Sequence, residues 1–105
     1  MSDYKQVLRS WADRQGQHKV RQKCIEELSE LIRALARGDD FENIAEELAD
    51  VRICCMQTEH ALTKECEELP ELIQESFNET ILELHKKLLM DAHNKEAELA
   101  DEVAG

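Results

Sequence analysis

Glu26-Glu27-Leu28-Ser29-Glu30 and Glu46-Glu47-Leu48-Ala49-Asp50 are nearly the same five-residue segment, present twice in this chain. Each copy lies in a stretch whose apolar residues recur about every 3.6 positions, from about 18 to 37 and from about 40 to 62. Between the two stretches, Gly38-Asp39-Asp40 combines a glycine that suits a helix C-cap with acids that suit a helix N-cap. The sequence therefore predicts two consecutive helices that fold back on each other, with Asp39 capping the second.

Four acids occupy matching places in the two segments. Glu27 and Asp50 are equally far from the turn, and so are Glu30 and Glu47. In an antiparallel pair of helices, Glu27 is then level with Asp50 and Glu30 is level with Glu47. We expect four carboxylates at one height between the two helices.

The composition favours an all-α fold. The chain has 105 residues, 35% of them charged and 4% aromatic, with three Gly and one Pro, and no alternating apolar run predicts a strand. Helical periodicity also appears at residues 3 to about 14 and from Pro70 to about residue 90. We expect an antiparallel helical bundle of about four helices.

The buried seam of the second helix is expected to be centred on Cys24, Leu28, Leu31 and Leu35, so that Glu27 and Glu30 flank it. The third helix has its main apolar stripe at Ile44, Leu48, Val51, Cys55 and Leu62. It also carries apolar residues on the opposite side, and a helix that is apolar on two sides needs cover on two sides. A homodimer or homotetramer is therefore expected.

Charge is unevenly distributed along the chain. Residues 1–23 hold six Lys/Arg against two acids, whereas residues 24–105 hold seven against twenty-two, for a net charge of −11. This balance disfavours a nucleic acid polymer as a partner but leaves room for a small anion near the basic segment. The four Cys lack zinc-site spacing, and no apolar run is long enough to span a membrane, so a cytoplasmic setting without a membrane partner is expected.

Grouped carboxylates in a partly buried groove repel one another unless a cation compensates them. No basic residue lies within the stretch from Glu27 to Glu30. Carboxylate oxygens prefer hard ions, which favours Mg²⁺, or Mn²⁺, as the cofactor. A solvated acidic face is the simpler alternative, but it does not explain two pairs in one register. A di-iron site is disfavoured because it needs Glu three residues before His, which none of His18, His60, His85 and His93 provides.

The segments 25–31 and 43–51 together resemble the MazG-like all-α nucleoside triphosphate pyrophosphohydrolases, whose pattern is ExxE, a spacer and ExxD. We expect residues 96–105, which are acidic and only weakly periodic, to form a frayed tail. The resemblance implies a single helical domain over residues 1–95. It also implies Mg²⁺-dependent cleavage of an NTP or dNTP to the monophosphate and pyrophosphate, in control of nucleotide pools. The metal ligands and catalytic residues would be Glu27, Glu30, Glu47 and Asp50.

Substrate contacts are also suggested by relatives, which use basic and polar side chains from flanking helices. Lys19 and Lys23 precede the first acid pair by about two turns and one turn and could contact phosphates. Lys86 and Asn78 are candidates on the last helix. Trp11 could stack on a base, although a single Trp on an amphipathic stripe more often belongs to a core.

Two other kinds of protein fit parts of the pattern. A catalytically silent helical adaptor would keep the fold and could keep the metal. An acidic coiled-coil scaffold would explain the charge but not the registered acid pairs. Release of pyrophosphate from a nucleotide panel separates the enzyme from both.

Overall fold

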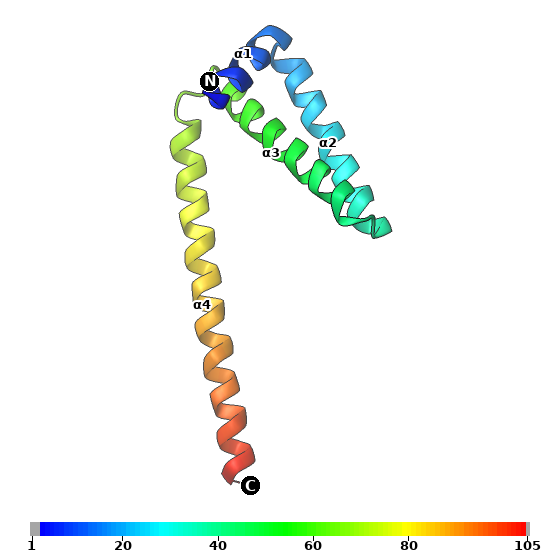
Figure 1. Cartoon of the computed structure of the whole chain (residues 1–105). Coiled ribbons are helices and arrows are strands. Elements are labelled where there is room, and N and C mark those ends of the chain that lie inside the picture. The colour runs from blue at the N-terminus through cyan, green and yellow to red at the C-terminus, as the bar shows by residue number, and fades with distance from the viewer. Residues whose placement is uncertain (1–2, 105) are drawn as a thin grey trace. The chain divides into compact units, whose positions relative to one another are not determined.

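A computed structural model describes residues 3–104 as four α-helices, with no strand among them (Figure 1). The helices are α1 (Tyr4–Gln15), α2 (Gln17–Arg37), α3 (Phe41–Thr63) and α4 (Leu69–Ala104). The chain divides into two units, of which the first is Met1–Leu69 and the second is Pro70–Gly105. The all-α prediction and the number of helices are confirmed.

The turns between helices lie at the expected residues. Gly16 and Gly38 have φ of 86° and 69°, a left-handed region that glycine enters without steric cost. The Gly38 amide donates to the carbonyls of Ala34 and Leu35 and so closes the end of α2. The expected cap is wrong by one residue, because Asp40, not Asp39, accepts the Asn43 amide at 2.9 Å. Asp39 is engaged instead by the side chains of Arg37 and Asn43.

Helices α2 and α3 form the most extensive helix pair of the first unit and lie side by side in Figure 1. The residues of α2 that are buried recur at spacings of three, four and seven, the period of a seam between two long helices. They are Val20, Cys24, Glu27 and Ala34. On α3 the buried residues are Cys54 and Ala61. Most of these side chains are small, which allows the two backbones to approach closely.

The expected seams are therefore wrong in register. Leu28 and Leu35 are 40% and 56% exposed, whereas Glu27 is 5% exposed and lies in the seam. On α3, Leu48 and Cys55 are exposed and Cys54 is buried in place of Cys55. Each helix is rotated so that its smaller residues face the partner helix, and its larger apolar residues form a second face.

Helix α1 packs against both other helices of the first unit. Ala12 is buried in a small cluster with Val20 of α2 and Ala61 of α3. The Gln57 side-chain amide donates to the Leu8 carbonyl at 3.0 Å, and Asp13 Oδ1 lies 2.8 Å from His60 Nε2 and accepts a hydrogen bond from Lys64. These polar contacts hold α1 against the C-terminal part of α3.

Helix α4 is the second unit, and it continues past residue 90, where the periodicity weakens. Its last part is rich in Ala and Glu, which are strong helix formers even without an apolar stripe. The expected apolar residues of α4 are exposed, among them Phe77, Ile81 and Leu88. No helix within residues 3–104 is long and apolar enough to cross a membrane.

Candidate metal centre and adjoining cavity

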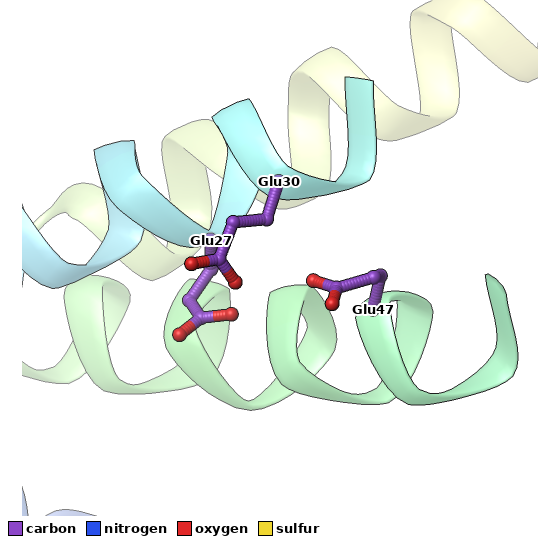
Figure 2. A group of neighbouring side chains, drawn as sticks. All are labelled: Glu27, Glu30 and Glu47. Atoms are coloured by element: carbon purple, nitrogen blue, oxygen red, sulfur yellow. The ribbon is translucent and has the colours of Figure 1, made fainter. Parts of the chain in front are cut away.

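Three of the four predicted acids converge between α2 and α3 (Figure 2). Glu27 and Glu30 come from α2 and Glu47 comes from α3, and each offers one carboxylate oxygen so that all three oxygens lie within 4.8 Å of one another. The i, i+3 spacing places the two α2 acids one above the other on the same side of the helix. The turn at Gly38 then brings Glu47 opposite them.

Asp50 is not one of the three, although it is close by. It lines the same cavity as Glu27. Its negative charge is also one of the influences that raise the pKa of Glu47. The level pairing of Glu27 with Asp50 and a ligand role for Asp50 both stay predictions.

The cluster contains buried oxygens without partners. Among residues 3–104, Glu27 Oε2 and Glu47 Oε2 are buried side-chain oxygens that accept no hydrogen bond. Burial raises the pKa of the Glu47 carboxyl above its ordinary value, and the neighbouring charges of Glu30, Asp50 and Glu27 raise it further. An unpartnered carboxylate oxygen beside other carboxylates is costly to bury and is the donor type that hard divalent ions select. The residues present therefore fit a divalent cation.

The ion pair between Lys23 and Glu27 is a feature of the cluster that the sequence analysis did not predict. The Lys23 ammonium nitrogen lies 2.8 Å from Glu27 Oε1. Hydrogen bonding to Glu27 raises the pKa of Lys23. The spacing of four residues along one helix is the signal that predicts such a pair. Lys23 supplies one positive charge to the cluster and leaves the other Glu27 oxygen free.

Cys54, next to Cys55 in the chain, lines the same cavity as Glu27 and Asp50. Burial raises the pKa of Cys54 to about 11 and also raises the pKa of Cys55. These thiols are therefore neutral at physiological pH, and neutral thiols are poor nucleophiles and poor metal ligands. They act as small apolar side chains, which keeps the oxygen-only character of the candidate metal centre.

A cavity of about 470 Å³ opens beside the acids, between α1 and the α2–α3 pair. The residues that line it include the acids Glu27 and Asp50, together with Lys23 and Trp11. A neighbouring cavity of about 390 Å³ is lined by Trp11, Lys19 and Lys23. The combined wall therefore offers acids, amines and one aromatic surface, which is a range of groups that suits a nucleotide.

The predicted substrate residues fall into two sets. Trp11 is 54% exposed and lines both cavities, so it is not part of the buried core, and its predicted contact with a base stays a prediction. Lys19 and Lys23 lie with it. Asn78 and Lys86 are on α4, in the other unit, where Asn78 accepts a hydrogen bond from Gln74 at 2.9 Å. Their part in a substrate site stays a prediction.

The three acids between two antiparallel helices, with a basic and aromatic cavity beside them, form an arrangement that could hold a divalent cation and a phosphate-bearing ligand. A family model described as the MazG nucleotide pyrophosphohydrolase domain matches residues 15–57. That range contains all four acids, and the resemblance to a MazG-like family is confirmed. Searches of curated proteins and of solved structures found no match to this chain.

Proposed function

We propose that this protein is a Mg²⁺-dependent nucleotide pyrophosphohydrolase that converts an NTP or dNTP to the monophosphate and pyrophosphate. The match to the MazG nucleotide pyrophosphohydrolase domain supports this class of activity. The observation that carries the proposal is the Glu27–Glu30–Glu47 cluster, in which Glu27 is buried, Glu30 and Glu47 are partly buried, and two oxygens have no partner. An oxygen-ligand cluster of this kind suits Mg²⁺, with Mn²⁺ as a substitute.

The reaction divides between the metal and the side chains. Glu27, Glu30 and Glu47 would hold the ion, with Asp50 as a further ligand or as the residue that orients the attacking water. Bound Mg²⁺ neutralises phosphate charge and helps to activate water in this kind of chemistry. Water attacks the α-phosphorus, the bond from that phosphorus to the bridging oxygen breaks, and pyrophosphate leaves. Lys19 and Lys23, which line the adjoining cavity, would contact the negative oxygens of the chain of phosphates.

Trp11 is proposed to contact the base. Its side chain lines the cavity that Glu27 and Asp50 also line, so a base stacked on it would share a cavity with these acids. An aromatic face binds any base by stacking, at about 1–3 kcal/mol per base, and therefore favours a range of nucleotides.

A second copy of the chain is proposed to cover the outer face of α2. Ile25, Leu28, Ile32 and Leu35 recur at spacings of three and four and are all exposed in the first unit. Such a stripe is typical of a helix that packs on another helix. A homodimer or homotetramer would bury it.

The decisive experiment incubates the full chain with a panel of NTPs and dNTPs in H₂¹⁸O, with Mg²⁺ and then with excess EDTA. We expect monophosphate and pyrophosphate, with the label in the monophosphate and no turnover in EDTA. Glu47→Gln should lose most of the activity while its helicity is unchanged, and Glu46→Gln, the exposed neighbour on α3, serves as the matched control. Metal binding without turnover of any nucleotide would instead favour the alternative, a catalytically silent helical adaptor.

A further inference from the structure

Lys23 and Glu27 form an asymmetric ion pair at the edge of the candidate metal centre. The Glu27 side chain is 7% exposed, whereas the Lys23 side chain is 59% exposed. The carboxylate is therefore held in the seam, and the ammonium reaches it from solvent on a flexible stem. Glu26 adds only a weak second contact, at 4.0 Å. In such a pair the cation can leave while the anion stays in place.

Lys23 also lies at the boundary between the acids and both cavities. It lines the cavity that contains Glu27 and Asp50, and it lines the cavity that contains Lys19. An ammonium on a four-carbon stem at this position can reach the Glu27 carboxylate or an anion in either cavity. No other Lys or Arg within residues 3–104 pairs with an acid of the cluster.

A divalent ion and the Lys23 ammonium compete for the same carboxylate. An ion bound to either oxygen of Glu27 would lie only a few ångströms from the ammonium, and like charges at that distance repel. The ion therefore weakens the ion pair, and the ion pair weakens binding of the ion. A polyphosphate in the cavity removes the conflict, because it offers the displaced ammonium several negative oxygens.

We propose that Lys23 is an exchangeable counter-ion, which holds the Glu27 carboxylate in the metal-free protein and transfers to the substrate's polyphosphate when metal and nucleotide bind. The proposal rests on the nucleotide pyrophosphohydrolase function and assigns to Lys23 a coupling role within it. By linkage, metal and polyphosphate each increase the affinity for the other through this one side chain. The exchange also keeps the acid cluster partly neutralised until substrate arrives.

The test measures binding of Mn²⁺ alone by electron paramagnetic resonance, without nucleotide, in the full chain. Lys23→Met should bind Mn²⁺ about three- to tenfold more tightly than the wild type, because the competing cation is gone. Lys23→Arg should stay close to the wild type. Lys19→Met is the matched control, since Lys19 lines the cavity but makes no ion pair within residues 3–104, and it should leave Mn²⁺ affinity unchanged.

A second measurement titrates inorganic tripolyphosphate into each protein at saturating Mn²⁺, so that the unknown base does not enter. Lys23→Met should bind tripolyphosphate more weakly and should lose most of the mutual enhancement between the two ligands. Unchanged or weaker Mn²⁺ binding by Lys23→Met, or full enhancement in that variant, would overturn the exchange.

The test of Lys23 and the test of the enzymatic function can fail independently of each other. A wild-type protein that binds Mn²⁺ but turns over no nucleotide refutes the enzyme, while the Mn²⁺ affinities still decide whether Lys23 competes. A wild-type protein that binds no Mn²⁺ refutes the metal centre and the counter-ion role together. Circular dichroism of Lys23→Met, and of Lys23→Gln as a second variant, verifies that the helices are intact.

Discussion

Replacing Glu27 with Gln should remove the stabilisation of this protein by divalent cations without lowering its metal-free stability. Glu27 is the most buried acid of the cluster, and one of its oxygens has no partner. At 4.8 Å, the limit of the separation between the Glu27 and Glu30 ligand oxygens, two unit charges repel by about 3.5 kcal/mol at an effective dielectric constant of about 20. That repulsion is a substantial fraction of the roughly 5–15 kcal/mol by which a native protein is stable.

In EDTA, the substitution has two opposing effects. It removes the repulsion from the neighbouring carboxylates, and it also removes the ion pair with Lys23. Because the Lys23 side chain is 59% exposed, the lost ion pair is worth at most about 1 kcal/mol, so we expect the melting temperature without metal to stay the same or to rise.

With metal, the two proteins should differ widely. An ion that binds only the folded state at a concentration one hundred times its Kd stabilises by about 2.7 kcal/mol. For a domain of this size that corresponds to a rise in melting temperature of about 10–20 °C. Glu27→Gln should show less than about a quarter of the wild-type rise at the same ion concentration.

The assay is thermal unfolding followed by circular dichroism, in EDTA, Mg²⁺ and Mn²⁺. Glu26→Gln is the matched control, because it removes an acid from the next position of α2 whose side chain is 67% exposed. That control should keep the full metal-dependent rise. An equal rise in Glu27→Gln and the wild type would refute the assignment of Glu27 to the metal, as would an equal loss in both variants.

Three further outcomes are expected from other parts of the first unit. Hydrogen bonds from Lys64 and His60 lower the pKa of Asp13 below 3.8. This carboxylate therefore stabilises the fold above that pH, and the stabilisation is lost as the pH falls through the folded-state pKa. The urea midpoints of the wild type and Asp13→Asn should differ near neutral pH and converge in acid, and a difference that persists in acid would contradict this role of Asp13. Trp11→Ala should raise KM for the best nucleotide by about five- to a hundredfold through lost stacking, with a smaller effect on kcat. A decrease in kcat with KM unchanged would place Trp11 outside the substrate site. Ala34 is fully buried between α2 and α3, so Ala34→Leu should lower the free energy of unfolding by about 1–3 kcal/mol, as measured by urea titration, and an unchanged value would show that the seam can open without strain.

The acid cluster illustrates how far spacing along the sequence can lead. Residues three apart on a helix share a side, and the glycine at position 38 fixes where the chain reverses, so Glu30 and Glu47 could be brought together from the sequence alone. The sequence could not show that Lys23 pairs with Glu27 in preference to solvent or phosphate, since a flexible lysine reaches several acids. For Trp11 the sequence left both a base contact and a core position open, because an amphipathic stripe on α1 does not reveal which of its residues the other helices cover.

By itself, the sequence determined the helices, the turn between α2 and α3 and the spacing that puts the two acids of each helix on the same side of that helix. Local propensities, a capping acid and a left-handed glycine act within a few residues and need no distant partner. Only the tertiary structure decided which side of α2 is buried, because the helix also carries apolar residues, such as Leu28 and Leu35, that stay exposed. The seam with Val20, Cys24 and Ala34 packs more closely than the one with larger Leu side chains, and its choice draws Glu27 inward. Burial of that one carboxylate, beside two others, is what turns a repeated acidic segment into a candidate metal centre.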